Sequence, residues 1–527
     1  MEKIKRLTRN RWLTVESDEP DPHIVERCTV EVIGAALAEF AGASVQTVTI
    51  NRTGRLDVPE SPLGMPAFVE EDLPEYCEVV VHQGNPGGHI ATVLVWVPLV
   101  WNRRFFGTAG GGNRTTTGLI PGDEFRTTTL ATAVRNGFAA ASTDGGVRQD
   151  GKLYDWELDE ETGRHDESLI ENWVHRSTHE MTLIGKAVTT AIHGTKPRYS
   201  YFQGSSGGGR QAIASALHHP SDYDGLYASD PAINWTRFVP ATLWPALVMK
   251  ELDNALAPAK FEAFRQGAVT EYNHRNGTTE PFTTSDEPPV FDPHQLVGSA
   301  TAAGQITEAD AQVMKMIWEG PRTPDGEQLW FGLRPGAESW DNPAGTCVTS
   351  EGSDGRRKPE PFVIATSWFG SWLLRNHEWD WTTITFDEFA QLFVQGVKEF
   401  AHVAVDDPDL SGLRDCGAKL LVTHGLDDQV IFSQGSRHYY ERVFAQMGGV
   451  SATNEFARFF LTPGDGHSAC IPSGFGIDLA TAMIALMNWV EKGIAPDSLE
   501  SRHFAEDGVT VDGVRVVPSY GTQQVTK

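Results

Sequence analysis

The feature that most constrains this chain is a glycine-rich turn that joins a strand-like segment to a helix-like one. Residues 204–208 read Gly-Ser-Ser-Gly-Gly, directly after the apolar run 199–203 and directly before a helical pattern from about Arg210 to His218. In a G-x-S-x-G turn between a strand and a helix, small neighbours let the central serine adopt a strained backbone conformation that exposes its hydroxyl. The pattern therefore predicts Ser206 as a nucleophile. The alternative is an ordinary strand-to-helix loop that happens to contain a serine.

Short apolar segments bounded by glycine recur in the first half of the chain and return near its end, with helical patterns between some of them. The segments typical of buried strands are 91–97, 138–142, 199–202, 419–423 and 458–461, and those typical of helices are 168–193, 210–218 and 479–489. Strands that alternate with helices indicate an α/β protein whose parallel sheet is covered on both faces.

The middle of the chain, residues 236–404, interrupts this alternation. It holds helical patches at 258–264 and 307–318 and many tryptophans. A doubly wound sheet tolerates insertions after its strands, above the edge where ligands bind. We therefore predict an α/β-hydrolase fold, with a doubly wound, mostly parallel sheet built from 1–235 and 405–527 and a large inserted lid domain at 236–404.

Two later strand-like segments run into loops that carry aspartate and histidine. In α/β-hydrolases the acid and the histidine follow the serine along the chain, each just beyond a later strand. We predict that His467 acts as general base toward Ser206 and then as acid toward the leaving alcohol. A buried carboxylate must fix the tautomer of that histidine. We choose Asp428, with Asp427 and Asp465 as the alternatives, and any of these acids can instead be an ordinary loop residue.

A tetrahedral oxyanion needs two backbone N–H donors, one from the residue after the nucleophile and one from an early strand-to-helix loop. The first is Gly207, and we predict the second to be Gly111 or Gly112, in a triple-glycine stretch that follows a strand-like segment. A phosphate cradle is the alternative for both glycine-rich stretches. Neither is followed by the Lys-Ser/Thr of a P-loop or fits G-x-G-x-x-G at the head of a first βαβ unit, which makes that alternative weak.

Composition excludes several classes of function. The chain has 43 lysines and arginines against 70 aspartates and glutamates, a formal net charge of −27, so we expect no nucleic-acid or membrane partner.

The sequence also bears on localisation and cofactors. It lacks a run of about 20 apolar residues, and no apolar run follows its basic N-terminus, so we expect a cytoplasmic protein unless a signal peptide has been trimmed. The five cysteines form no CxxC pair, and we predict no metal and no other cofactor. The sequence predicts no particular oligomeric state.

Nine further motifs are spread over most of the chain. They are LPEYC at 73–77, WNRRFF at 101–106, ASTDGG at 141–146, SYFQGSSGGGRQ at 200–211, YDG at 223–225, PAINW at 231–235, FDP at 291–293, GPR at 320–322 and PDG at 324–326. Together they are highly specific. Through them the chain resembles the tannase and feruloyl esterase family of α/β-hydrolases, which also contains bacterial hydrolases of terephthalate monoesters.

The resemblance implies the same triad as the residues themselves: Ser206, Asp428 within the HGxxDxxI pattern of 424–431, and His467. It also implies that the substrates are small-molecule esters of aromatic acids, such as hydroxycinnamate, gallate or terephthalate-like esters. It further implies hydrolysis through an acyl-enzyme and a lid that supplies the pocket for the acyl group.

The cysteines depart from the family pattern. The family usually has one cysteine just before the serine and one just after the histidine, joined by a disulfide. These positions are Ser205 and Ser468, so that disulfide cannot form, and Cys470 close by has no obvious partner. Cys28 and Cys77 resemble another family pair, and we expect them to be thiols in a reducing compartment.

The lid also departs from the family pattern. Many family members carry an aspartate-rich calcium loop there, whereas the equivalent stretch, 270–279, has Glu271 as its only acid. A hard cation prefers several carboxylates. We therefore predict no tight calcium site.

The densest aromatic cluster of the lid, with an adjacent cation, is a candidate for substrate contacts. Trp368, Phe369 and Trp372 form a predicted slot for an aromatic acyl group, and Arg375 is the predicted partner of a carboxylate or phenolate. The alternative is that these aromatic residues are the hydrophobic core of the lid, beside a snorkelling arginine.

Three functions fit this pattern to different degrees. The first is a serine esterase for aromatic esters. An acyltransferase or a lactonase would use the same triad, because water and other nucleophiles attack the same acyl-enzyme. A non-catalytic ligand receptor on a hydrolase fold is less favoured, because such a protein would normally lack one triad member.

Overall fold

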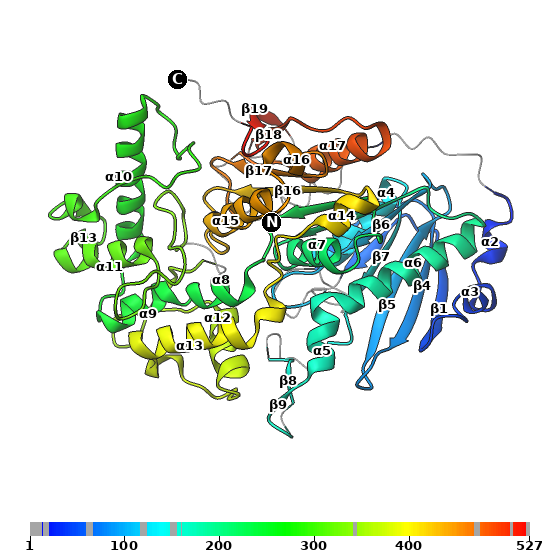
Figure 1. The fold of residues 1–527 in the computed structure, drawn as a ribbon, viewed down its shortest axis with the longest axis horizontal. Helices are drawn as coiled ribbons and strands as arrows, with labels where there is room; N and C mark the ends of the chain where they lie inside the picture. The colour runs from blue at the N-terminus through cyan, green and yellow to red at the C-terminus, as the bar shows by residue number, and fades with distance from the viewer. Residues whose placement is uncertain are drawn as a thin grey trace.

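A nine-stranded sheet is the centre of the molecule (Figure 1). The computed structural model describes residues 13, 21–58, 67–115, 124–147, 155–159, 161–340, 345–467, 475–505 and 510–522. In spatial order the strands are β1 (Ala43–Asn51), β4 (Tyr76–Gly84), β5 (Ile90–Pro98), β7 (Ala139–Thr143), β6 (Arg104–Thr108), β10 (Tyr199–Ser205), β11 (Gly225–Ser229), β16 (Lys419–Gly425) and β17 (Ala457–Thr462).

The six strands from β7 to β17 are parallel, and this part of the sheet bears the predicted site. The pairs β1–β4, β4–β5 and β5–β7 are antiparallel, so the sheet is mixed at one side. The sheet is mostly parallel, and the predicted α/β-hydrolase fold class is confirmed. Because the carboxyl ends of parallel strands meet at one edge, the loops after β6, β10, β16 and β17 lie along the same edge.

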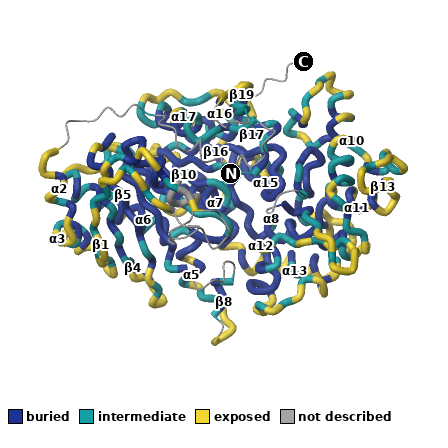
Figure 2. Tube along the Cα trace, turned by 180° about the vertical axis from the view of Figure 1, so that it is seen from behind, coloured by how far each residue is buried: buried dark blue, intermediate teal, exposed yellow. Residues whose placement is uncertain are grey.

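Strand residues are buried on both faces, which explains why the strands read as continuous apolar runs. In β5, Val93, Val95 and Val97 belong to the hydrophobic cluster on one face, whereas Leu94 and Trp96 belong to the cluster on the other. The first cluster includes residues of α6 (Ser177–His193) and α7 (Gly207–His218), and the second includes residues of α4 (Glu124–Arg135) and α17 (Leu479–Lys492). Figure 2 shows this buried interior along the sheet, with exposed residues toward the periphery.

The helical segment predicted at 168–193 is interrupted by a π-helix. It comprises α5 (Glu167–Glu171), the π-helix η1 (Asn172–Arg176) and α6. The Ser177 hydroxyl donates to the Asn172 carbonyl over 2.7 Å, and the buried Arg210 guanidinium donates to the carbonyls of Trp173 and Val174. These side chains bond carbonyls in and beside the widened turn, which accounts for the local change of helix type.

Residues 236–404 add helices beside the sheet, toward the left of Figure 1. The elements of this region are α9 (Trp244–Glu251), α10 (Pro258–Asn276), α11 (Glu308–Glu319), α12 (Val363–Ser367), the π-helix η3 (Trp368–Leu373), α13 (Phe386–Glu399) and the hairpins β12–β13 (Ala300–Thr301, Gly304–Gln305) and β14–β15 (Thr349–Glu351, Arg357–Pro359). Among the described residues between 230 and 418, none belongs to a strand of the large sheet. We keep 236–404 as the proposed bounds of the lid domain.

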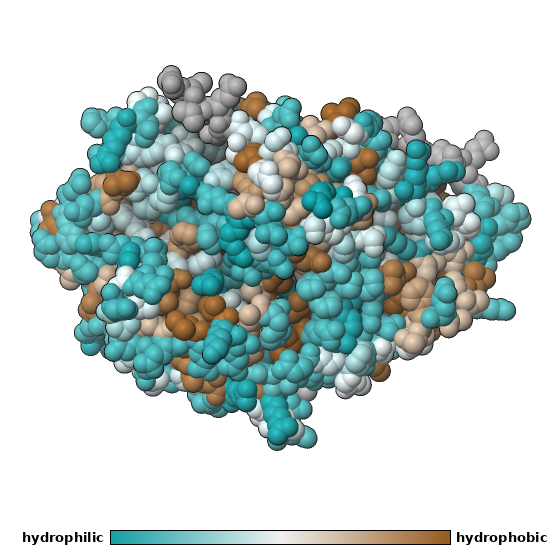
Figure 3. Space-filling view, viewed as in Figure 1, coloured by the Kyte–Doolittle hydropathy of each residue, from teal (hydrophilic) through white to brown (hydrophobic). Residues whose placement is uncertain are grey.

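The remaining elements surround this framework. They are α2 (Ile24–Arg27), α3 (Val30–Ala36), α8 (Trp235–Ala241), α14 (Ser411–Cys416), α15 (Ser433–Gln446), α16 (Val450–Thr453) and the pairs β2–β3 (Leu56–Val58, Phe68–Glu70), β8–β9 (Leu158–Asp159, Arg164–His165) and β18–β19 (Ser498–Phe504, Val511–Pro518), with short 3-10 turns at Pro293–Leu296, Trp381–Thr383 and Ala401–Val403. The face drawn in Figure 3 is mainly hydrophilic, with hydrophobic residues in separate patches. Within the described part of the chain, no helix combines the length and the apolar character needed to cross a bilayer.

Candidate active site

The predicted nucleophile lies in a sharp turn between β10 and α7. Ser206 has φ 60° and ψ −122°, a positive φ that is uncommon for a residue with a side chain. Its N–H donates to the Ser229 carbonyl over 2.9 Å, and its own carbonyl accepts from Arg210 N and Ala232 N. The backbone of the turn is therefore tied to the neighbouring strand and to the helix, which holds the strained conformation in place.

Glycines surround this turn because other backbone segments approach it closely. A Cβ atom at Gly204 would overlap the carbonyl oxygen of Gly208, and one at Gly207 would overlap that of Gly112. A Cβ at Gly208 would lie 2.6 Å from the carbonyl oxygen of Gly110, closer than van der Waals contact allows. The Gly-x-Ser-x-Gly pattern therefore has a steric cause at each of these glycines.

The three residues predicted as a triad meet at the carboxyl edge of the sheet. His467 Nε2 lies 2.9 Å from Ser206 Oγ, and His467 Nδ1 lies 2.7 Å from Asp428 Oδ2. Ser206 follows β10, Asp428 follows β16 and His467 follows β17. With Nδ1–H donating to the carboxylate, Nε2 carries the lone pair that accepts the serine proton.

Asp428 is buried and held from several sides. Its Oδ1 accepts from the N–H groups of Val430 and Ile431, both over 2.8 Å, while its Oδ2 faces His467 and, at 3.0 Å, His424 Nε2. Burial alone would favour the neutral acid, but these two histidines hold the pKa of Asp428 well below its usual range. The carboxylate is therefore ionised and fixed in orientation.

The electrostatic effect on His467 has the opposite sign. Burial favours the neutral ring, but the charge of Asp428 and the hydrogen bond to it outweigh this effect and raise the pKa of His467. The backbone N–H of His467 donates to Gln429 Oε1 over 3.1 Å. The side chain is 12% exposed, so a substrate can reach it from the solvent side.

The two alternative acids have other surroundings. Asp427 forms an ion pair of 3.2 Å with the buried Arg334. Burial and the charges of Asp230 and Asp428 raise the pKa of Asp465 well above its usual range. Of the three predicted acids, Asp428 is the one with a hydrogen bond to His467.

The predicted oxyanion donors lie beside the serine. The N–H of Gly110 donates to Gln211 Oε1 of α7 over 3.0 Å, which ties the triple-glycine loop to that helix. The same loop packs against the first residues of α7, because Gly111 and Gly112 are the backbone neighbours of Gly207. The first N–H groups of a helix have no partner within the helix and point toward its N-terminus. The loop and the helix start therefore present amide groups at one place.

The aromatic residues predicted to bind substrate are packed inside the protein. Trp368, Phe369 and Trp372 are at most 2% exposed. Trp372 lies against aromatic rings of both regions: Trp156, Trp173, Trp368 and Phe400. These contacts are those of a hydrophobic core, as the alternative interpretation expects. Trp372 of the π-helix η3 points toward Trp156 and Trp173, whereas Phe369 packs against Trp379 and Phe389.

Arg375 lies at the surface at the end of this cluster. Its side chain is 49% exposed and forms an ion pair of 3.6 Å with Glu399. It therefore has a protein partner on the solvent side of the lid. We leave these four lid residues out of the proposal for the substrate site.

Sequence reasoning missed two residues that support the triad. His424 bonds to Asp428, and its Nδ1 lies 2.9 Å from Ser436 Oγ; Gln429 holds the backbone of His467. In the sequence, His424 stands out only as the first residue of the HGxxDxxI pattern of 424–431. Together with Asp230, His424 and Asp428 form one of two groups of three close metal-binding side chains among the described residues. Because Asp428 is already bonded to His467 and to backbone N–H groups, we assign this group to the catalytic hydrogen-bond network.

The cysteine predictions have different outcomes. Ser468 and Cys470 lie outside the described residues, and Ser205 is the last residue of β10. Cys28 and Cys77 are buried and form no disulfide in the structure, and the Cys28 thiol donates to the Ile24 carbonyl over 3.3 Å. The expected thiol state of this pair stays a prediction.

The lid stretch compared with a calcium loop lies mostly in a helix. Residues 270–279 cover the last turns of α10 and the two residues after its C-terminal glycine. Glu271 forms an ion pair of 2.6 Å with Arg275. The absence of a tight calcium site stays a prediction.

Comparison with known proteins places this geometry in context. A family model described as "Tannase and feruloyl esterase" matches residues 77–524. A probable feruloyl esterase of Arthroderma benhamiae is 36% identical over 450 residues, which are 83% of this chain and 80% of that protein. A probable feruloyl esterase B of Aspergillus clavatus is 26% identical over 490 residues, 90% of this chain and 88% of that protein.

Two solved structures have the same fold. Tannin acyl hydrolase from Aspergillus niger superposes with a TM-score of 0.78 at 22% identity, covering 94% of this chain and 93% of that one. Feruloyl esterase B from Aspergillus oryzae gives a TM-score of 0.73 at 22% identity, covering 93% and 96%.

Proposed function

Because this chain belongs to the tannase and feruloyl esterase family and is a carboxylic ester hydrolase, we propose that it cleaves esters of aromatic acids through an acyl-enzyme on Ser206. The observation that carries the proposal is the hydrogen-bonded series from Ser206 Oγ through His467 to Asp428. This series ends on a serine in a strained turn, beside a loop of backbone amides. Such an arrangement is the one that nucleophilic acyl transfer requires.

In the first half of the reaction, Ser206 Oγ attacks the ester carbonyl carbon and His467 Nε2 accepts the hydroxyl proton. The imidazolium that forms is stabilised by Asp428, which keeps its own charge. When the tetrahedral intermediate collapses, the C–O bond to the alcohol breaks and His467 returns the proton to the leaving oxygen. Water then attacks the acyl-enzyme by the same steps, with His467 again as base and then as acid.

The negative charge on the intermediate requires fixed donors. The N–H of Gly207 and that of Gly111 or Gly112 are the proposed pair, supported by the close packing of the triple-glycine loop on the start of α7. Backbone amides that are already oriented stabilise the developing charge without reorganisation. The dipole of α7 adds to this effect, because Ser206 lies at its N-terminus.

The proposed acyl group is aromatic. The names of the similar proteins support this choice: feruloyl esterase for several relatives, and tannin acyl hydrolase for one protein of the same fold. A comparison of methyl gallate, methyl ferulate, a terephthalate monoester and short aliphatic esters ranks the acyl groups. Higher kcat/KM for an aromatic acyl group supports the proposal, and a preference for the aliphatic esters contradicts it.

Burst kinetics with a p-nitrophenyl ester test the acyl-enzyme. The wild type should release about one p-nitrophenol per site before steady state if deacylation is the slower step, and Ser206→Ala should show neither burst nor turnover. Ser205→Ala, which removes the hydroxyl of the adjacent residue, is the matched control and should retain both. Trapping the acyl group and finding it by mass spectrometry on a peptide without Ser206 would contradict the assignment. Full turnover in Ser206→Ala would do so as well.

A further inference from the structure

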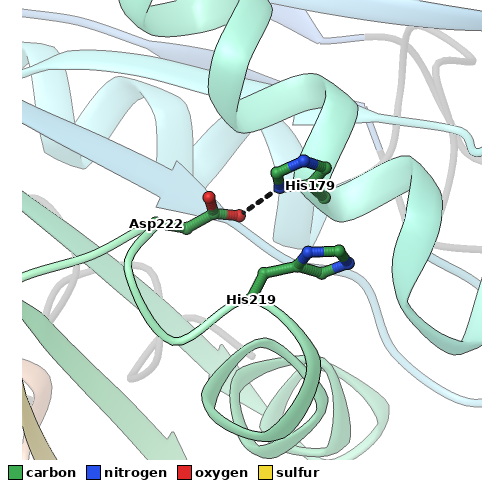
Figure 4. Close-up of side chains that lie close together, drawn as sticks. All are labelled: His179, His219 and Asp222. Atoms are coloured by element: carbon green, nitrogen blue, oxygen red, sulfur yellow. Dashed lines mark hydrogen bonds and ion pairs between the residues drawn. The ribbon is translucent and has the colours of Figure 1, made fainter. Parts of the chain in front are cut away.

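Four histidines and one aspartate gather at the end of α7 that is remote from Ser206. His175 belongs to η1 and His179 to α6, His218 and His219 end α7, and Asp222 lies in the turn that leads into β11. Helix α7 has 12 residues and therefore rises about 18 Å between the two ends. This group thus lies one helix length from the proposed active site. Figure 4 shows three of its members, His179, His219 and Asp222.

The side chains of the group are in direct contact. His179 Nδ1 lies 2.7 Å from Asp222 Oδ2, and the rings of His179 and His219 stack with centroids 3.9 Å apart and planes 9° apart. His175 Nδ1 lies 3.0 Å from His219 Nε2. One ligand atom from each of His179, His219 and Asp222 lies within 4.8 Å of the others.

We propose that His179, His219 and Asp222 bind a divalent transition-metal ion of the zinc type. Two imidazole nitrogens and one carboxylate oxygen are a donor set that Zn²⁺ and its neighbours accept, whereas Ca²⁺ and Mg²⁺ prefer oxygen alone. Three protein ligands leave one position of a tetrahedral ion for water. The His179 side chain is 29% exposed, so an ion can enter from solvent.

The hydrogen bonds indicate which atoms coordinate. His219 Nε2 is bonded to His175, so Nδ1 is the atom of His219 that is free to bind the ion, and His175 orients the ring. The ion would replace the proton between His179 Nδ1 and the Asp222 carboxylate. The neutral His179 ring would then carry its proton on Nε2. Because an imidazole binds a metal ion in the plane of its ring, the stacked rings must tilt as the ion enters.

The net charge of the chain and a fixed turn support this proposal. The chain has a formal net charge of −27, which attracts cations to its surface. The backbone of the turn is also fixed, because Asp222 N donates to the His219 carbonyl over 3.0 Å.

A bound ion would join two segments of the fold: α6, and the end of α7 together with the turn into β11. Since these segments are far apart in the sequence, the ion would act as a cross-link that is present only in the folded chain, and it should raise the melting temperature. The ion is remote from Ser206, so the proposal concerns stability and is independent of the esterase mechanism.

The test uses Co²⁺ as a spectroscopic probe and Zn²⁺ as its competitor. Full-length protein is freed of metal with a chelator and titrated with Co²⁺, and the visible absorption of tetrahedral Co²⁺ is followed before and after addition of Zn²⁺. We expect one site per chain, loss of this absorption in the double variant His179→Gln/His219→Gln, and about 10- to 100-fold weaker binding in His175→Ala. His89→Gln is the matched control, because His89 forms a 2.7 Å pair with Asp166 without belonging to a close group of three such ligands.

Two results would overturn the proposal. One is the same Co²⁺ stoichiometry and affinity in the double variant as in the wild type, which would place the ion elsewhere, for example at Asp230, His424 and Asp428. The other needs no variant: X-ray absorption of the wild-type Zn²⁺ form should show two imidazole ligands, and a shell of oxygen atoms alone rejects the site. Circular dichroism of the metal-free variants confirms that they are folded. Ser206→Ala should bind Co²⁺ like the wild type, so failure of the esterase proposal and failure of this one are distinguishable.

Discussion

Helix α7 has a histidine–aspartate pair at each end, and the two pairs have the same hydrogen-bond length. His467 Nδ1 and Asp428 Oδ2 are 2.7 Å apart near its N-terminus, and His179 Nδ1 and Asp222 Oδ2 are 2.7 Å apart near its C-terminus. At the first end the other ring nitrogen faces a serine hydroxyl, whereas at the second a further imidazole stacks on the pair. The pair itself therefore does not define the chemistry of either site.

Burial and the partners of the carboxylate make the difference. The Asp428 side chain has no exposed surface, and two backbone N–H groups fix its Oδ1; the side chains of Asp222 and His179 are 7% and 29% exposed. A buried, rigid carboxylate orients a ring for proton transfer toward one atom. A more exposed pair with a second imidazole can open to admit an ion. The function of each histidine–aspartate pair therefore depends on the third group beside it, a serine hydroxyl or a second imidazole, and on how far the pair is exposed to solvent.

The largest expected effect tests the catalytic end. His467→Ala should lower kcat by about 10⁶-fold, because the serine loses its base and the leaving alcohol its acid. His89→Ala removes a histidine from a pair of the same length, His89–Asp166, and should change kcat less than about twofold. Steady-state hydrolysis of an activated ester measures both. Similar losses in the two variants would mean that the triad geometry confers no special role.

The second effect separates two adjacent acids. Asp428→Asn should lower kcat by about 10⁴-fold, because the histidine loses both its charge partner and its favoured tautomer. Asp427→Asn should cost less than about tenfold in kcat but destabilise the fold by about 3–5 kcal/mol, because Arg334 loses its buried counter-charge. Turnover and urea unfolding give the two numbers. A greater loss of turnover in Asp427→Asn than in Asp428→Asn would make the acid assignment wrong.

The sequence predicts those parts of the site whose conformation is determined by residues close by in the chain. The Ser206 turn needs small residues around it, so its glycines are visible in the sequence, and each later strand ends in a recognisable loop. The choice between Asp427 and Asp428 is different, because adjacent loop residues point in different directions. It depends on Arg334, more than 90 residues away in the sequence.

Tertiary packing also decides the features that sequence reasoning missed or left open. Trp368 and Trp372 are a cluster that is equally typical of a core and of a binding slot, and only the contacts with Trp156 and Trp173 separate these alternatives. The histidine group at the far end of α7 comes from two segments about 40 residues apart. The spacing of its members along each segment occurs in many helices without a metal ion, so the group becomes visible only when α6 and α7 pack together.

The third effect concerns the amide donors at the catalytic end. Gly207→Ala should lower kcat by about 10²- to 10³-fold, because the added methyl group would displace Gly112 and with it the proposed oxyanion loop. Gly34→Ala in α3 is the control, since a Cβ there meets nothing within 4 Å and should stabilise the helix by about 0.5–1 kcal/mol. Unchanged kcat in Gly207→Ala would contradict the proposed position of the donors.

The fourth effect is a shift of the pH profile. His467 must be neutral to act as base, and the charge of Asp428 raises its pKa. The acid limb of kcat/KM should therefore reach half its maximum above the ordinary pKa of histidine, and activity should fall as the pH drops through that point. In Asp428→Asn the raising charge is gone while burial remains, so the limb should move to lower pH. A limb that moves to higher pH, or stays in place, would mean that another group controls the profile.

The smallest effect on catalysis is expected from the lid aromatic cluster. Trp372→Ala removes a side chain that is 2% exposed and should cost about 3–5 kcal/mol of stability, with the KM for an aromatic ester unchanged. Arg375→Ala removes an exposed partner of Glu399 and should change stability by less than about 0.5 kcal/mol, also with unchanged KM. Chemical denaturation and steady-state kinetics on methyl ferulate measure both. A raised KM in either variant at unchanged stability would assign that residue to the acyl pocket. A residue that only supports the core would change KM only if the fold were destabilised.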